Sequence, residues 1–253
     1  MNQIVNDLIK FFLDEGEHRV IDIPTNYVHK REFLRGLMNV RDAKIVPSNI
    51  IEKENELLQK ELEEKKITNI EDFNDKFSLW QGDITTIKCD AIVNPATSNL
   101  LGCFKPNHNC IDNKVHTYAG ISLRLKCKEI TKGSNIETSK VILTEGYNLP
   151  CDYIIHAVKP IVDNELTDEK KEEIKDFYIN SLDLAKNNNL KSICIPNISI
   201  NNSELKKEVS EISLSAVINY LKDDDFFEKV VFNLFTLDDF NIYNETMEKL
   251  FLK

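Results

Sequence analysis

The sequence predicts an α/β domain, with a largely parallel sheet covered on both faces by helices, preceded by a helical extension. From about residue 77, short apolar runs alternate with helical stretches, which is the pattern of strands joined by helical crossovers. Before that point apolar residues recur only at helical spacing, without a strand pattern. We therefore divide the 253-residue chain into an extension at 1–76 and an α/β domain at 77–253.

Three helices are predicted in the extension. The first is amphipathic, with apolar residues at Ile4, Leu8 and Phe12, and Gly16 closes it. The second lies within 29–40, and the third within the charged segment 48–66, whose acid–base pairs are typical of a solvated helix face.

Strands and helices alternate in the α/β domain. Strands are predicted at 77–82, 90–95, 140–149, 152–158, 191–198 and 229–235, and helices near 112–131, 167–188, 204–221 and 239–252. In parallel sheets, ligands bind in the loops that follow the carboxyl ends of strands. We therefore expect the functional residues in those loops.

Composition narrows the class of protein. The formal net charge is −10 and no basic run stands out, which argues against a general nucleic-acid binder. No apolar run approaches the ~18 residues of a membrane span, and the start of the chain lacks a signal-peptide pattern. We expect a cytoplasmic protein without a disulfide framework, in which Cys89, Cys151 and Cys194 are buried small hydrophobic residues.

Cys103, His108 and Cys110 lie together in a loop rich in Pro and Asn. Thiolate and imidazole ligands suit zinc, and three protein ligands with an open fourth position form the catalytic type of zinc site. The spacing is not that of a zinc finger. A nucleophilic cysteine assisted by a histidine, or a loop of unrelated polar residues, are the alternatives that the spacing leaves open.

The helix after this loop begins near Asp112 and Asn113, which could cap its free N–H groups. A helix N-terminus also favours anions. His116 is four residues beyond Asp112, on the same helical face, and is expected to be a packed histidine.

Several motifs together carry a resemblance to a known family: "LWQGDITTIKCDAIVNPATSNLLG" at 79–102, the run Cys-Phe-x-Pro-x-His-x-Cys-Ile-Asp-Asn, "HTYAG" and "ISLRLKC". They resemble the zinc-containing macrodomains, which are ADP-ribosyl hydrolases linked to sirtuin-like ADP-ribosyltransferases. The resemblance covers nearly the whole chain. It implies a macrodomain, a three-layer α/β/α fold with a mixed, largely parallel central sheet, plus an N-terminal helical extension.

The resemblance also implies roles for single residues. Asp83 matches the aspartate that binds the adenine amino group, and Ile84 offers the adjacent backbone N–H. Asn94 and Asp112 match catalytic residues beside the distal ribose. Cys103, His108 and Cys110 match Zn²⁺ ligands. The other residues implied to bind the ligand are Asn113, Ala119, Gly120, Asn197, Ile198, Ser199, Ile200, Asn201 and Asn233.

The implied activity is zinc-dependent removal of ADP-ribose from a mono-ADP-ribosylated protein, with a lipoyl carrier protein as a candidate substrate. We expect a monomer that binds neither nucleic acid nor membrane. Three positions depart from the family pattern: the second phosphate loop, 197–203, has no glycine, Thr97 replaces an asparagine, and Lys159 replaces a glycine. The alternative is therefore a macrodomain that binds ADP-ribose or a related nucleotide with little or no catalysis.

Overall fold

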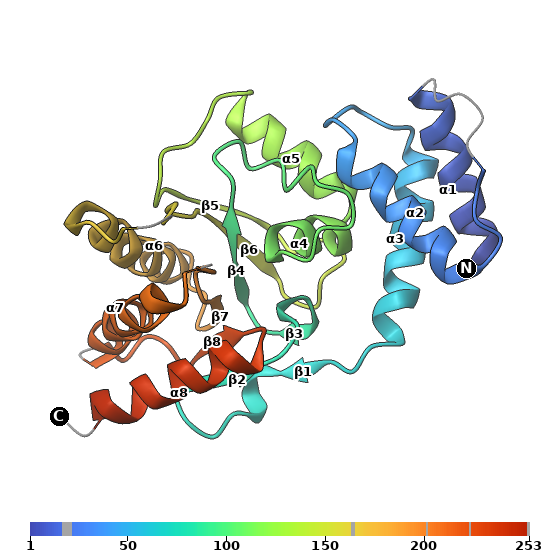
Figure 1. The fold of residues 1–253 in the computed structure, drawn as a ribbon. Coiled ribbons are helices and arrows are strands. Elements are labelled where there is room, and N and C mark those ends of the chain that lie inside the picture. Colours follow the sequence, from blue (N-terminus) through green and yellow to red (C-terminus); the bar gives the residue numbers. More distant parts are fainter. Residues whose placement is uncertain (17–21, 163–164, 201, 223, 252–253) are drawn as a thin grey trace.

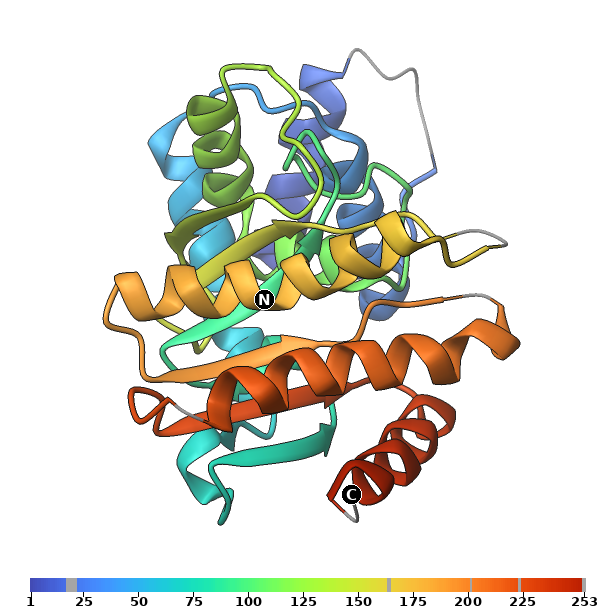
Figure 2. The same ribbon diagram turned by 90° about the vertical axis from the view of Figure 1, so that its left-hand side faces the viewer.

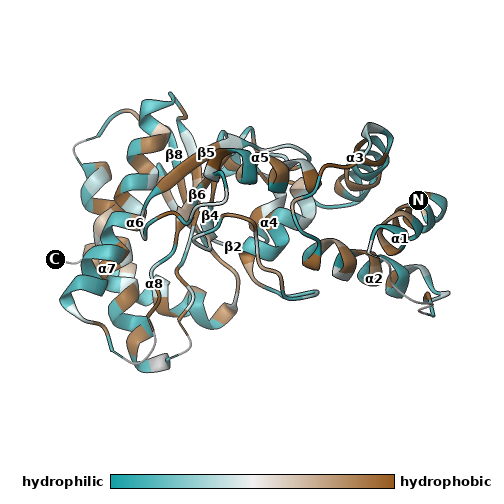
Figure 3. Ribbon diagram, turned by 90° about the horizontal axis from the view of Figure 1, so that it is seen from above, coloured by the Kyte–Doolittle hydropathy of each residue, from teal (hydrophilic) through white to brown (hydrophobic). Residues whose placement is uncertain are grey.

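The computed structural model describes residues 1–16, 22–162, 165–200, 202–222 and 224–251. A central six-stranded sheet lies between two layers of helices, and a further layer of three helices flanks one side (Figures 1 and 3). The predicted fold class is confirmed. Among the residues that the structure describes, no helix is long and apolar enough to cross a membrane.

The strand order of the main sheet is β2-β8-β7-β4-β6-β5. All neighbours pair in parallel except the edge strand β5, which is antiparallel to β6. The bounds are β2 Phe77–Gln81, β4 Ala91–Ala96, β5 Val141–Glu145, β6 Tyr153–Val158, β7 Ser192–Pro196 and β8 Lys229–Leu234. Each of these strands falls on one of the six predicted apolar runs.

Helices cover both faces of the sheet. The bounds are α4 Ile111–Ala119, α5 Ile121–Thr131, α6 Asp168–Asn187, α7 Ser203–Lys222 and α8 Leu237–Phe251. Figure 2 shows α6, α7 and α8 side by side on one face, where Phe177, Tyr178 and Phe232 form part of the core. On the other face, α4 and α5 bury a second core that contains Cys89, Cys151 and Cys194, so these cysteines are buried as predicted.

The extension consists of α1 Asn2–Glu15, α2 Tyr27–Val40 and α3 Ser48–Glu63. Its apolar faces enclose a small core of their own, to which α5 contributes Ile121. The three helices lie on the outer side of α4 and α5 (Figures 1 and 3). The extension is therefore packed against the helical layer that carries the predicted metal loop.

The structure corrects two expectations about secondary structure. The long helix predicted at 112–131 is broken at Gly120, whose φ of 97° lies in the region that favours glycine. The region before residue 77, where no strand was expected, contains β1 Thr68–Asn69, which pairs in parallel with β3 Ile87–Lys88. A two-residue strand is too short to produce an alternating pattern. Short 3₁₀ helices, η1 Ile70–Asp72 and η2 Ile84–Thr86, complete the connections.

Candidate functional site

A cleft of about 580 Å³ opens at the carboxyl ends of the parallel strands. Five strands contribute a residue just beyond their last position: Asp83 after β2, Thr97 after β4, Lys159 after β6, Ser199 after β7 and Phe235 after β8. This is the edge at which the topology predicts ligand binding. The predicted residues that line the cleft are Asp83, Ile84, Cys103, His108, Cys110, Asp112, Asn197, Ser199 and Asn233.

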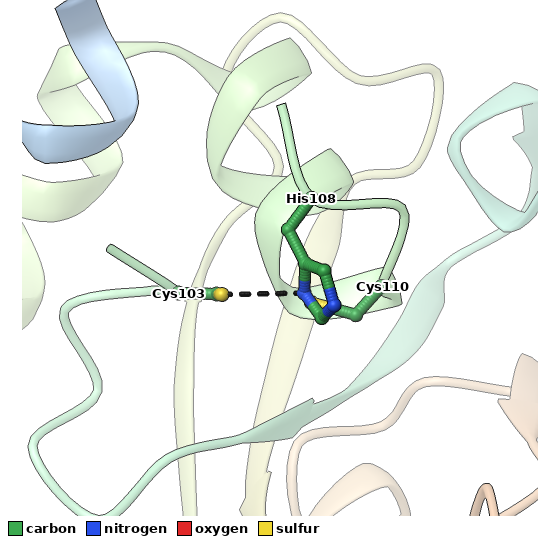
Figure 4. Close-up of side chains that lie close together, drawn as sticks. All are labelled: Cys103, His108 and Cys110. Carbon is green, nitrogen blue, oxygen red and sulfur yellow. Dashed lines mark hydrogen bonds between the residues drawn. The ribbon is translucent and has the colours of Figure 1, made fainter. Parts of the chain in front are cut away.

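Figure 4 shows Cys103, His108 and Cys110 close together, and all three line the cleft. Their ligand atoms all lie within 4.8 Å of one another, and Cys103 Sγ is 3.4 Å from His108 Nδ1. Ligand bonds of 2.0–2.3 Å in a tetrahedral zinc site place neighbouring ligand atoms about 3.5 Å apart. The three donors are half-buried and border open space in the cleft, so they fit a zinc ion with one free position.

The environment of Cys110 disfavours the nucleophilic alternative. Burial, and to a smaller extent the neighbouring Cys103 thiol, raise the pKa of Cys110 to about 11. A nucleophilic cysteine requires a depressed pKa, because the thiolate is the reactive form. A bound cation would stabilise that thiolate as a ligand, which suits a metal site better than a free nucleophile.

Asp112 is a buried carboxylate at the floor of the cleft, in the first turn of α4. The helix cap predicted at Asp112 is wrong: Cys110 is the N-cap, and its Sγ accepts a hydrogen bond from the backbone N–H of Asn113. Asp112 Oδ1 instead accepts from Asn94 Nδ2 at 2.8 Å, while Oδ2 has no partner within the described protein. Burial raises the pKa of Asp112 to about 6, and the Asn94 hydrogen bond opposes that rise.

Asn94 lies beneath Asp112 and has no exposed surface. It is directly paired with His156 on the neighbouring strand, and its Nδ2 lies 3.2 Å from His156 Nδ1. Because the Asn94 amide is the donor there, His156 Nδ1 must accept, which leaves Nε2–H to donate to Thr144 Oγ1 at 3.0 Å. Burial lowers the pKa of His156 to about 3, consistent with this neutral form. Asn94 thus contributes to the cleft by orienting the Asp112 carboxylate.

Asp83, Lys114 and Phe235 form a second cluster in the lining of the cleft. Asp83 Oδ1 caps η2 by accepting from the backbone N–H of Thr85. Asp83 Oδ2 pairs with Lys114 Nζ at 3.3 Å, and the same ammonium lies 4.1 Å from the centre of the Phe235 ring. Lys114 therefore bridges a carboxylate and an aromatic face that both border the cleft.

The second phosphate loop is built differently from a glycine-rich loop. Ile198 and Ile200 were predicted to bind ligand, but their side chains belong to the core behind the sheet. The backbone N–H of Ile198 donates to Tyr178 Oη at 3.3 Å, and that of Asn197 donates to the Asn233 carbonyl at 3.1 Å. Within the described part of this loop no residue has a positive φ. Asn201 lies outside the described residues.

Three further predicted ligand residues do not line the cleft. Asn113 is fully buried, and its amide donates to the carbonyls of Cys103 and Lys105. Ala119 is also fully buried, in the core that faces the sheet. Gly120 lies against the extension instead, where an added Cβ would approach Glu54 Oε2 to 3.2 Å. The break at Gly120 turns this backbone toward α3, away from the cleft.

Several cleft and network residues were missed by sequence reasoning. Lys114, Thr144 and His156 form part of the site. His156 stood inside a predicted strand, but only strand pairing reveals that it is opposite Asn94. Phe235 was recognisable from its place after the last strand, where a parallel sheet positions ligand contacts. Lys159, which replaces a glycine of the family pattern, is exposed and borders the cleft.

Comparison with known proteins agrees with this architecture. A sequence family described as Macro domain matches residues 93–213. A protein-ADP-ribose hydrolase of Staphylococcus aureus is 35% identical over 257 residues, covering 98% of this chain and 95% of that protein. A protein-ADP-ribose hydrolase of Treponema medium is 34% identical, covering 95% of this chain and 96% of its own.

Solved structures give the same result. A mutant Oceanobacillus iheyensis macrodomain with ADPR has a TM-score of 0.63 at 34% identity, covering 71% of this chain and 96% of that one. A Trypanosoma brucei macrodomain in complex with ADP-ribose has a TM-score of 0.61 at 25% identity and covers 72% of this chain. The sequence match along nearly the whole chain and the shared fold show that the chain belongs to the macro domain family.

Proposed function

We propose that this macrodomain is a hydrolase that removes ADP-ribose from mono-ADP-ribosylated protein, with Zn²⁺ held by Cys103, His108 and Cys110. One observation carries the proposal: the Asp112 carboxylate, oriented by Asn94, lies in the same cleft as the Cys–His cluster. Relatives that align over nearly the whole chain are named protein-ADP-ribose hydrolase, which supports the reaction class.

Hydrolysis joins a water oxygen to the anomeric carbon of the distal ribose as the bond to the carrier side chain breaks. Asp112 holds this water and accepts its proton, a role open to it because its pKa of about 6 leaves it largely ionised near neutral pH. Asn94 fixes the carboxylate from below. The departing carrier side chain takes up a proton, and free ADP-ribose is the other product.

The rest of the cleft binds the nucleotide in this proposal. Asp83 and Phe235 take the adenine, through a hydrogen bond to its amino group and contact with its ring face. Ser199 and Lys159 border the middle of the cleft, where the diphosphate would lie. When bound, zinc would supply Lewis-acid polarisation of a ribose hydroxyl or of the attacking water.

Incubation of the zinc-loaded protein with a mono-ADP-ribosylated carrier, followed by chromatography, tests the proposal. Release of free ADP-ribose, with recovery of the unmodified carrier, is the expected result. No release at high enzyme concentration would contradict it. A mono-ADP-ribosylated lipoyl carrier protein is one of the substrates tested, because we propose lipoyl carrier proteins as the substrate class.

A module that binds ADP-ribose weakly, or binds a related nucleotide, with little or no catalysis is the second candidate, and it rests on the altered second phosphate loop. The backbone N–H groups of Asn197 and Ile198 already donate within the protein, so they are not available to a diphosphate. Hydrogen bonds to charged groups contribute about 1.5–3 kcal/mol each, so two fewer would weaken binding by roughly two to four decades. Calorimetry with ADP-ribose separates the candidates, because a binding module takes up ADP-ribose but leaves the modified carrier intact.

His108→Ala tests whether the metal is catalytic. Loss of a ligand is expected to weaken zinc binding by at least about 100-fold and to abolish turnover, while the unfolding free energy of the metal-free protein changes little. Metal content and turnover are measured on one preparation, and urea unfolding on the same preparation after chelation. If chelation alone unfolds the wild-type protein, the zinc has a structural role instead.

Lys114→Met tests the proposed adenine-binding part of the cleft. Lys114 pairs with the Asp83 carboxylate and covers the Phe235 ring, so an incoming adenine must displace it. A partly buried ion pair and a cation–π contact in a solvent-open cleft together are worth about 1 kcal/mol, so the variant should bind ADP-ribose roughly fivefold more tightly. Calorimetry measures the change, and Lys126→Met, on the exposed side of α5, is the control. Weaker binding by Lys114→Met would show that Lys114 contacts the nucleotide.

A further inference from the structure

The loop that carries the three candidate metal ligands is a tight turn with little regular structure of its own. The backbone N–H of His108 donates to the Lys105 carbonyl at 3.2 Å, and Asn107 has a φ of 51°. With Pro106 second and a left-handed residue third, residues 105–108 have the features of a type II turn. An asparagine tolerates this φ but does not enforce it, so the turn needs support from elsewhere.

That support comes from helix α2 of the extension. The backbone N–H of Asn107, the left-handed residue, donates to Asn39 Oδ1 at 3.0 Å. Asn39 is itself fixed, because its Nδ2 donates to Thr117 Oγ1 on α4 at 3.1 Å. Gly36, one helical turn earlier, also lies against the loop: an added Cβ would lie 3.6 Å from the side-chain amide of Asn107, at van der Waals contact. Helix α2 therefore lies directly on the turn that presents His108.

Arg35 holds the same loop at a second point. Its Nη2 donates to the His108 carbonyl at 2.9 Å and to Asn113 Oδ1 at 2.7 Å. Asn113 in turn donates to the carbonyls of Cys103 and Lys105, and its backbone N–H donates to Cys110 Sγ. Arg35 and Asn113 thus connect to all three candidate ligand residues.

We propose that helix α2 belongs to the candidate metal site: Arg35 and Asn39 are positioning residues that hold Cys103, His108 and Cys110 in ligand geometry. This inference rests on the proposed function for its link to zinc, but the contacts belong to the protein alone. Arg35 and His108 are 73 positions apart in the chain, so the extension and the α/β domain together build the site.

Arg35→Gln and Asn39→Ala test the inference in the full chain. Both variants should bind zinc about 10- to 100-fold more weakly in competition with a chelator, the effect typical of losing outer-sphere support. Turnover should fall, whereas ADP-ribose affinity should hold, because neither residue borders the cleft. The matched control is Arg31→Gln: Arg31 lies one turn earlier on α2 and pairs with Glu61 within the extension.

A second readout does not depend on zinc. Cys103 and Cys110 are half-buried while the other four cysteines are buried, so a thiol reagent reports mainly on this loop. In metal-free protein, Arg35→Gln should react about tenfold or more faster than wild type, and Arg31→Gln at the wild-type rate. Equal zinc affinity and equal thiol reactivity in wild type and the two test variants would overturn the inference. If wild type binds no zinc, the proposed function fails, and the thiol rates alone still decide the inference.

Discussion

Asp112→Asn is expected to lower turnover by about 10²–10⁴-fold while leaving ADP-ribose binding nearly unchanged. General acid–base groups contribute rate enhancements of that size. The asparagine keeps the shape of the side chain and can still accept the Asn94 hydrogen bond through its carbonyl oxygen. It cannot take a proton from water, however. Single-turnover release of ADP-ribose measures the chemical step, and calorimetry measures binding.

Two controls make this result specific. Asp152→Asn removes an exposed carboxylate outside the cleft and should leave turnover at the wild-type level. Thermal unfolding of Asp112→Asn checks the helix, because an acidic residue in the first turn of α4 contributes about 0.3–1 kcal/mol. Full activity in a folded Asp112→Asn protein would exclude Asp112 as the proton acceptor.

Glu54→Gln is expected to raise the free energy of unfolding by up to about 3 kcal/mol at pH 8, with little change at pH 4.5. Glu54, on α3, is 1% exposed, and both its oxygens accept from the backbone N–H of Ile121 at the start of α5. Burial raises the pKa of Glu54 from 4.5 to about 7, despite that hydrogen bond. The ionised form is therefore costly in the folded protein, and the neutral amide avoids that cost.

Wild-type stability decreases with rising pH because the pKa of Glu54 is raised in the folded protein. Between pH 4.5 and about 7 the folded protein holds a proton on Glu54 that the unfolded chain releases, so wild-type stability falls as the pH rises through this window. The unfolding free energies of wild type and Glu54→Gln are measured in urea from pH 4.5 to 8. Their difference at each pH isolates the contribution of Glu54. Glu56→Gln, which removes an exposed carboxylate paired with Lys60 on the same helix, should leave the urea midpoint nearly unchanged at every pH. A difference between Glu54→Gln and wild type that does not vary with pH would contradict the prediction.

The strands could be predicted because each buried strand is a continuous apolar run bounded by polar residues. The break between α4 and α5 could not, because the hydrophobic pattern continues across Gly120. At Gly120 an added Cβ would lie 3.2 Å from Glu54 and Leu58 of α3, a tertiary contact that the local pattern does not contain. The β1–β3 pair was likewise invisible, since two residues have no period.

The candidate site could likewise be predicted only in part. Cys103, His108, Cys110 and Asp112 lie close in sequence, and the structure brings them to one cleft. The interior positions of Ile198 and Ile200 depend on how that loop crosses the core, which local sequence does not specify.

The pairing of β2 with β8 also determines when the cleft forms during synthesis. Strand β2 is an edge strand whose sheet neighbour is β8, so its partner, at residues 229–234, is made about 150 residues later. At 5–20 residues per second the ribosome needs roughly 8–30 s to add them. Asp83, just beyond β2, gains its place near Phe235 only then. A nascent chain can therefore complete the loop that carries Cys103, His108 and Cys110 well before the cleft exists, and the cleft forms only as the last strand leaves the ribosome.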